Sequence, residues 1–257
     1  MLNATDVSLS FGGLKALDRV SIQAEPGAVT GLIGPNGSGK STLLNVIGGV
    51  YVPDSGSVTL NGAPLPLGRP DRVAKCGIGR TFQVPKLAHR LTVFQNMLAG
   101  ERDHCGERLS NLFLAPGKVA RQERDATERA VSILTRLGMR HKANDLAGSL
   151  SGGQQKLLTM GMLLMADPAV LLLDEPAAGV NPVLIEQQVE FLKTLRAEGR
   201  IIILIEHNMD MIANVCDRVF VLDAGALIAT GTPAEIRANE TVIRSYLGQP
   251  ANAQEAS

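Results

Sequence analysis

The clearest chemical pattern in the chain is a glycine-rich stretch, "GPNGSGKST", from Gly34 to Thr42. Its glycines let backbone N–H groups turn inward around phosphate oxygens, and the helix expected after it adds the positive end of its dipole. Lys40 can reach β- and γ-phosphates, and the Ser41 hydroxyl can bind Mg²⁺. The alternative is a chance glycine turn before a helix. We expect a nucleoside triphosphate to contact this phosphate loop, which consists of Gly34, Pro35, Asn36, Gly37, Ser38, Gly39, Lys40, Ser41 and Thr42.

Two carboxylates end a nearly apolar run, "AVLLLDE", from Ala169 to Glu175. Carboxylates at the end of a buried strand are costly unless they meet a cation or hydrogen-bond donors. Asp174 would hold Mg²⁺, mostly through water, and Glu175 would orient and deprotonate the attacking water. The alternative is a helix N-cap, because "DEPAAG" also resembles the exit from a strand into a loop. A phosphate loop in the same chain favours the catalytic interpretation.

Three further side chains could join such a site. His207 follows "IILIE" at another strand end, where open α/β sheets place ligand groups, although a lone histidine is usually structural. Gln83, in "GRTFQ", could bind Mg²⁺ or water through its amide, although a surface glutamine is the default. Phe11 could stack on a base, and core packing is the alternative that the residues alone favour.

A second glycine pair occurs in "LSGGQQ", from Leu150 to Gln155. Ser151 can cap a helix there, and Gly152 and Gly153 expose backbone N–H groups near its start, which makes a second anion site. The stretch has no lysine and no metal ligand of its own. It is suited to complete a site that is held elsewhere.

These groups need a particular set of elements to position them. An apolar run over 27–34 and helical spacing after it predict a strand, a loop and a helix. "SGSVTLNGAPL" predicts a strand and turn, and "VFVLDAGALIATGTP" predicts a hairpin. The runs over 169–175 and 200–207 read as buried parallel strands, joined by an amphipathic helix. Charged, helically spaced residues over 84–150 predict an inserted helical subdomain.

Length and composition agree with one domain that carries an insertion. The chain has 257 residues, and Lys+Arg and Asp+Glu both total 25, so no general positive field suggests nucleic-acid binding. Three scattered cysteines match neither a zinc site nor a disulfide framework, which fits a reducing cytosol. We expect no secretory signal and no membrane-spanning helix. If the protein serves a membrane, we expect it to do so from outside the lipid.

Five motifs together, "GPNGSGKST", "TFQ", "LSGGQ", "LLLDEP" and "IEH", resemble those of ABC transporter ATPase subunits in order and spacing. The resemblance covers nearly the whole chain. It implies an α/β P-loop NTPase fold, with a RecA-like parallel sheet core, an N-terminal antiparallel β part and an inserted helical subdomain. The expected ABC ATPase domain covers 1–248, with the core at 1–83 and 156–248, the helical subdomain at 84–155, and a disordered tail at 249–257.

The resemblance also implies ATP and Mg²⁺ as ligands and a head-to-tail dimer, with ATP between the phosphate loop of one subunit and the signature loop of the other. That signature loop is Ser151, Gly152, Gly153 and Gln154. Gln83, His207 and Phe11 correspond to the Q-loop glutamine, the switch histidine and the adenine-stacking aromatic. Asn181 lies at the D-loop position, in "AAGVNP", which departs from the commoner S-A-L-D.

A closer resemblance, to branched-chain amino-acid importer ATPases and their urea and amide relatives, comes from "FGGLKALDRVS", "LTVFQNMLAG", "DEPAAGVNP" and "VIRSYLG". It implies a peripheral subunit on the cytoplasmic face of the inner membrane. The implied partners are a second ATPase subunit, identical or paralogous, membrane permeases and, indirectly, a periplasmic binding protein. Alternatives are an ABC subunit of another transporter, such as the lipopolysaccharide-export type, a non-transport ABC ATPase in translation or DNA repair, and a P-loop kinase.

Overall fold

The computed structural model describes residues 1–81, 86–101 and 116–247, and its contacts divide the chain into two compact units. Unit 1 is made of Met1–Ile78, Ala169–Ala178 and Leu192–Ser257. Unit 2 is made of Gly79–Pro168 and Gly179–Phe191. The expected domain limits stay a prediction, and the tail expected at 249–257 lies outside the described residues.

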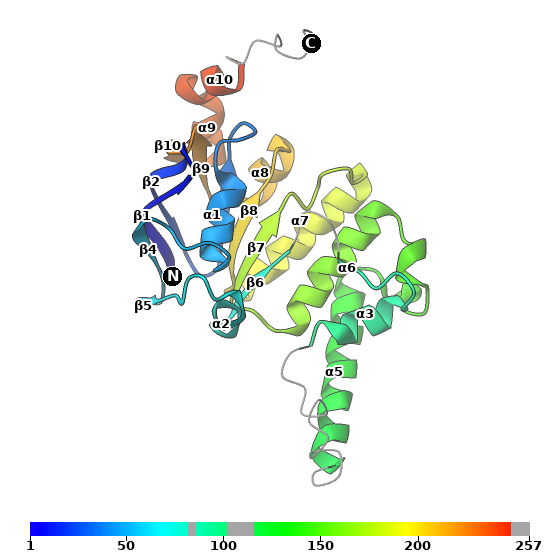
Figure 1. The fold of residues 1–257 in the computed structure, drawn as a ribbon. Coiled ribbons are helices and arrows are strands. Elements are labelled where there is room, and N and C mark those ends of the chain that lie inside the picture. The colour runs from blue at the N-terminus through cyan, green and yellow to red at the C-terminus, as the bar shows by residue number, and fades with distance from the viewer. Residues whose placement is uncertain (82–85, 102–115, 248–257) are drawn as a thin grey trace, which may run out of the picture. The chain divides into compact units, whose positions relative to one another are not determined.

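An antiparallel sheet forms the N-terminal part of unit 1 (Figure 1). Its strand order is β2-β1-β4-β5, and the strands are β1 (Leu2–Phe11), β2 (Leu14–Ala24), β4 (Ser55–Leu60) and β5 (Ala63–Pro64). The strand and turn expected in "SGSVTLNGAPL" are confirmed, because β4 pairs with β5 in antiparallel register.

A second sheet carries the chemistry, with the strand order β10-β9-β3-β8-β7-β6. The strands are β3 (Ala28–Ile33), β6 (Ile78–Arg80), β7 (Val170–Asp174), β8 (Ile201–Ile205), β9 (Arg218–Asp223) and β10 (Ala226–Gly231). The neighbours β9, β3, β8 and β7 pair in parallel, and β9 and β10 form the expected hairpin. Every residue of β7 and β8 is buried, which explains why their sequences are apolar up to Asp174, the last residue of β7.

Helix α1 (Lys40–Ile47) follows the phosphate loop and anchors it to the core of unit 1. Its residues Leu43, Leu44, Val46 and Ile47 belong to one buried cluster with apolar side chains of both sheets. The other helices of unit 1 are α2 (Pro70–Lys75), α8 (Met209–Val215), α9 (Pro233–Ala238) and α10 (Glu240–Leu247). Since β3 and α1 are both held by the core, the loop between them is fixed at both ends.

The regular elements that unit 2 contains are helices, as the charged segment over 84–150 predicted, except for the last two residues of strand β6. It contains α3 (Val93–Ala99), α5 (Pro116–Arg136), the 3₁₀ turns η2 (Arg140–Lys142) and η3 (Ala147–Ser149), and α6 (Gly152–Met165). Helix α7 (Pro182–Ala197) begins in unit 2 and ends in unit 1. The expected limit at 155/156 falls inside α6, which unit 2 keeps whole.

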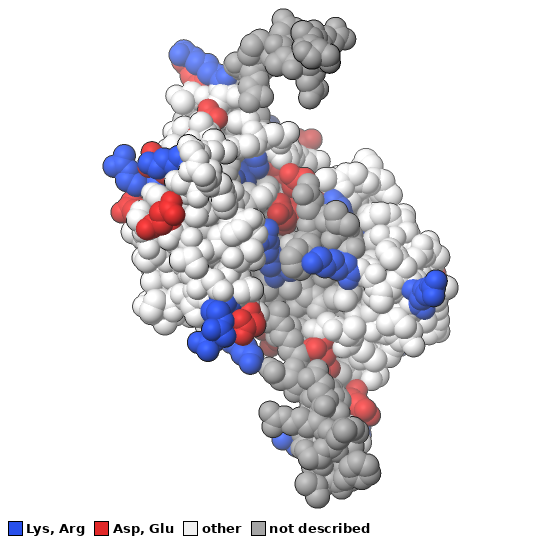
Figure 2. All heavy atoms as spheres, viewed as in Figure 1, with Lys and Arg blue, Asp and Glu red and all other residues white. Residues whose placement is uncertain are grey.

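The surface of the described residues carries both signs of charge. Figure 2 shows Lys and Arg interspersed with Asp and Glu on the face in view, in small groups. No helix among the described residues combines the length and the apolar character that crossing a bilayer requires.

Candidate nucleotide-binding and hydrolysis site

The phosphate loop lies between the end of β3 and the start of α1, as the sequence predicted. The Lys40 ammonium donates hydrogen bonds to the carbonyl oxygens of Gly34 and Pro35, both at 2.8 Å, and lies 3.4 Å from the Ser38 hydroxyl. Lys40 is only 6% exposed. The loop therefore wraps around its own lysine.

The backbone of this loop suits a phosphate group. A Cβ on Gly34 would overlap the carbonyl oxygen of Leu222, so only glycine fits at the start of the loop. Gly39 occupies the N-cap of α1 with φ +100° and makes no side-chain capping bond. The first-turn N–H groups of a helix have no partners within the helix, so an anion can satisfy them here. Ser41, which follows Lys40 in the first turn of α1, is exposed.

A turn that the sequence analysis did not single out supports the loop from behind. The Gly225 N–H, between β9 and β10, donates to the Ser38 carbonyl at 3.1 Å, and the Gly225 carbonyl accepts from the Asp18 N–H at 2.8 Å. The turn thus ties the phosphate loop to β2. The sequence indicates this turn only through "DAG" in the predicted hairpin, and that pattern does not indicate that the turn contacts the phosphate loop.

The structure brings the expected lysine and carboxylates together in unit 1. Burial lowers the pKa of Lys40, while the negative charges of Glu175 and, to a smaller extent, Asp174 raise it. Both carboxylates therefore interact electrostatically with the Lys40 ammonium. This is the electrostatic arrangement expected of a phosphate-binding cation beside a metal-binding and catalytic pair.

Asp174 and Glu175 lie at the carboxyl end of β7. Asp174 is the last strand residue, is paired in register with Ile205 and is 7% exposed. The Glu175 N–H donates to the Ile205 carbonyl at 2.9 Å, and Glu175 has φ +48°. A left-handed backbone costs a non-glycine residue free energy, so its surroundings must hold it.

His207 meets Glu175 beyond the strand ends. Its Nε2 lies 3.0 Å from Glu175 Oε1, and the two side chains are 40% and 22% exposed. Solvent can therefore reach a pair of groups that together can orient a water molecule and accept its proton. The expected third polar side chain, that of Gln83, lies outside the described residues.

The residues present fit a magnesium ion shared with a nucleotide. No cluster of three or more His, Cys, Asp or Glu side chains among the described residues could hold a metal alone. Mg²⁺ typically takes one or two protein ligands and completes its shell with substrate phosphates and water. Asp174 supplies a carboxylate of the required kind from the end of β7, and Ser41 supplies a hydroxyl directly after the phosphate-binding lysine in the sequence.

Phe11 is an exposed aromatic side chain. It ends β1, is 44% exposed, and meets the ring of Tyr51 edge-on with 5.2 Å between ring centroids. Core packing, the alternative interpretation of Phe11, is therefore wrong. Tyr51 was not singled out from the sequence, where nothing linked it to Phe11.

The second glycine pair begins α6 in unit 2, and its serine caps the helix as predicted. The Ser151 hydroxyl accepts the Gln154 N–H at 3.3 Å, and the Gln154 side-chain oxygen accepts the Ser151 N–H at 3.1 Å. Gly152 is exposed with open space beside it. Gly153 is buried, and a Cβ there would lie 2.9 Å from Leu184.

Asn181, at the expected D-loop position, has a local structural role. Its side-chain oxygen accepts the Leu184 N–H at 2.9 Å, ahead of Pro182 at the start of α7. This is the arrangement of a helix N-cap followed by an N1 proline.

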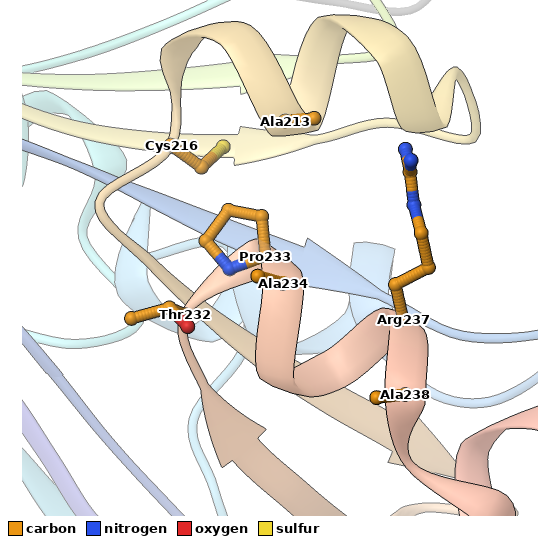
Figure 3. A pocket seen from close by; sticks show the side chains of 7 residues that line it. All are labelled: Ala213, Cys216, Thr232, Pro233, Ala234, Arg237 and Ala238. Atoms are coloured by element: carbon orange, nitrogen blue, oxygen red, sulfur yellow. The ribbon is translucent and has the colours of Figure 1, made fainter.

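A separate pocket of about 540 Å³ lies between α8 and α9 of unit 1 (Figure 3). Its lining residues are Ala213, Cys216, Thr232, Pro233, Ala234, Arg237 and Ala238. Burial is the largest cause that raises the pKa of the Cys216 thiol, to about 12, so this thiol stays protonated. None of the expected site residues lines this pocket.

Residues 17–178, more than half of the chain, match the family model described as "ABC transporter", and the chain belongs to this family. The match confirms the resemblance stated from the five motifs. Residues 226–252 match a second family model, described as "Branched-chain amino acid ATP-binding cassette transporter".

Similar proteins extend along nearly the whole chain. A probable branched-chain amino acid transport ATP-binding protein, LivG of Archaeoglobus fulgidus, is 38% identical over 248 residues, which are 96% of this chain and 95% of that protein. The crystal structure of a nucleotide-free ATP-binding cassette from an ABC transporter has a TM-score of 0.84 and 37% identity, and covers 97% of this chain and 99% of its own. A cassette in its ADP conformation has a TM-score of 0.83 and 34% identity, with the same coverage of 97% and 99%. The expected fold class is thereby confirmed.

Proposed function

We propose that the protein is the ATP-hydrolysing, energy-coupling subunit of an importer for branched-chain amino acids or a related small amino acid or amide. The observation that carries the proposal is the contact of 3.0 Å between Glu175 and His207, beside a buried lysine whose pKa responds to Glu175 and Asp174. The ADP conformation of the similar cassette supports nucleotide binding, and the names of the relatives support the substrate.

Each site residue has a defined task in this proposal. Lys40 and the N–H groups of the phosphate loop bind the β- and γ-phosphates of ATP. Glu175 accepts the proton of the attacking water, and His207 orients Glu175 and contacts the γ-phosphate. Asp174, Ser41 and Gln83 would hold Mg²⁺, which neutralises charge that develops on the phosphates. Phe11 stacks on the adenine.

The signature loop, from Ser151 to Gln154, would serve the nucleotide of a second subunit. It offers a helix start and an exposed glycine but has neither lysine nor metal ligand, so it can only complete a site built by other residues. A chain with one phosphate loop and one signature loop makes two complete sites by pairing head to tail with an identical or a paralogous chain. ATP binding would close this dimer, and hydrolysis would reopen it.

The remaining partners follow from the transport role. Membrane permeases would receive the motion of the dimer through unit 2, and a periplasmic binding protein would deliver the cargo to them. The protein would therefore work as a peripheral subunit on the cytoplasmic face of the inner membrane, without nucleic acid.

The test is ATP-driven uptake in vesicles. The chain is reconstituted with the permeases encoded beside its gene, the paralogous ATPase if one is encoded there, and the binding protein. We expect labelled leucine, isoleucine or valine to accumulate only with ATP inside. A Glu175→Gln chain supplies the matched inactive control. ATPase activity without uptake of leucine, isoleucine or valine would refute branched-chain amino acids as the cargo. Absence of ATPase activity in the complete assembly would refute the proposed chemistry.

A further inference from the structure

We propose that Glu206, a buried carboxylate beside the candidate catalytic pair, is a positioning residue that holds Glu175 and His207 in their mutual geometry. The inference rests on the proposed ATP hydrolysis and adds to it a residue that neither contacts the phosphates nor carries the reacting proton. The side chain of Glu206 is 2% exposed, so its contacts lie within the protein.

Glu206 connects the two segments that carry the pair. Its Oε1 accepts the Ala177 N–H at 2.6 Å, two residues after Glu175. Its Oε2 accepts the His207 N–H at 3.0 Å and the Asn208 N–H at 3.3 Å. One carboxylate thus binds the backbone that follows β7 with one oxygen and the backbone that follows β8 with the other.

The position of these bonds explains why the pair needs them. Strands β7 and β8 are paired up to Asp174 and Ile205, and the Glu175 N–H still reaches the Ile205 carbonyl. Beyond that point, the Glu206 side chain connects the backbones of the two segments, in addition to the side-chain contact between His207 and Glu175. Glu175 also has φ +48°, a conformation that persists only where surrounding contacts enforce it.

A carboxylate meets this requirement and an amide does not. All three groups bonded to Glu206 are backbone N–H donors, and an ionised carboxylate offers only acceptors. In Glu206→Gln, the side-chain NH₂ group would face one of these N–H groups, whichever way the amide turned. One segment would then lose its bond while the size of the side chain stayed the same.

Asp217→Asn is the matched control. Asp217 also lies in unit 1 and also accepts a backbone N–H, that of Val29 at 2.9 Å, while pairing with Arg196 at 2.6 Å. Val29 lies near the start of β3, whereas the phosphate loop follows the end of that strand. The control makes the same carboxylate-to-amide change away from the catalytic pair.

The first measurement is steady-state ATPase activity of the reconstituted assembly. We expect Glu206→Gln to lower kcat about tenfold or more with a KM for ATP within about twofold of wild type, because the phosphate loop is untouched. Asp217→Asn should keep both values near wild type. If Glu206→Gln does not fold, Glu206→Asp, which is too short to reach both segments, is measured in its place. A wild-type kcat in the folded variant overturns the proposal.

The second measurement separates positioning from general stability. If Glu206 acts through the pair, its substitution should matter much less in a His207→Ala background, because the pair is already broken there. If the Glu206 substitution lowered kcat by the same factor in the wild-type and His207→Ala backgrounds, its role would be structural, which would overturn the proposal.

Hydrogen exchange of the nucleotide-free chain gives a readout that does not depend on ATPase activity. Exchange at Ala177 and His207 should accelerate in Glu206→Gln and not in Asp217→Asn. Unchanged exchange overturns the connection itself, even if the wild-type protein hydrolyses ATP. Accelerated exchange in a chain without ATPase activity would instead refute the proposed function and its catalytic positioning role together.

Discussion

The Nε2 atom of His207 lies 3.0 Å from the Oε1 atom of Glu175, and the two residues come from the ends of neighbouring parallel strands. They are 32 positions apart in the sequence. This contact orients the Glu175 carboxylate, which solvent can still reach. It also defines which substitutions should affect chemistry and which should affect only binding or folding.

Replacing Glu175 by glutamine should stop turnover and preserve nucleotide binding. Glutamine keeps the shape of the side chain but cannot accept the proton of the attacking water, and a general base typically contributes about 10²–10⁴-fold to rate. Position 175 has φ +48°, and this left-handed backbone costs glutamate and glutamine a similar free energy, so the substitution should change stability little. ATPase assays and ATP binding to the same preparation check this. Near-normal turnover would remove Glu175 from its role.

Lys40→Ala should weaken ATP binding by about one to two decades, because a charge-assisted hydrogen bond is worth about 1.5–3 kcal/mol. Calorimetric titration with ATP measures the affinity. Lys75→Ala removes the same charge from an exposed position on α2 of the same unit and should leave the affinity unchanged. Equal affinities for the two variants would contradict the role of Lys40.

Two capping boxes in unit 2 allow the signature serine to be tested against a matched cap. Ser151 caps α6 with Gln154, and Thr92 caps α3 with Gln95. Substituting either cap by alanine should cost about 0.5–2 kcal/mol of stability. Only Ser151→Ala should also lower ATPase activity beyond that effect. Thermal unfolding and ATPase assays on both variants decide, and equal ATPase losses would leave Ser151 as a cap alone.

A shared site predicts complementation between damaged subunits. Ser151→Arg and Lys40→Ala each damage both sites of a homodimer, whereas a mixed dimer has one site with both lesions and one with neither. Mixing the two damaged proteins, with the membrane subunits present, should therefore raise ATPase activity above that of either protein alone. A signature loop that acts within its own chain would leave every site of the mixture damaged once.

A disulfide cross-link tests the same arrangement directly. Asn36 and Gly152 are both exposed, so cysteines placed there can react if the loops of two chains face each other. Cys76, Cys105 and Cys216 are replaced first. We expect ATP-dependent dimers on a denaturing gel. Cross-links confined within single chains would rule out the shared site.

The Cys216 thiol should make stability depend on alkaline pH. Its pKa rises from 9.0 to about 12 on folding, so the unfolded chain loses this proton above pH 9 while the folded chain keeps it. The free energy of unfolding should therefore fall as pH rises from 9 towards 12, by up to about 1.4 kcal/mol per pH unit. Cys216→Ala should remove this part of the slope in denaturant titrations, and an unchanged slope would contradict it.

The sequence by itself determined the parts of the site whose function depends on local spacing. The phosphate loop consists of consecutive residues between a strand and a helix. The cap of α6 consists of Ser151 and Gln154, which are three residues apart. Features of such short range can be recognised in the sequence. The apolar runs of β7 and β8 were recognisable because strands buried on both faces are apolar at nearly every position, and Asp174 ends the run of β7.

Tertiary structure alone decided the contacts between segments that are distant in the sequence. In the sequence, Glu206 is a single carboxylate directly after an apolar run, and only folding places it against the Ala177 N–H. The support of Ser38 by Gly225 and the packing of Phe11 on Tyr51 were hidden for the same reason. Periodicity and spacing predict which elements form. Which backbone donor meets which buried acceptor depends on the register and direction of packed strands, because these bring separate strand ends together.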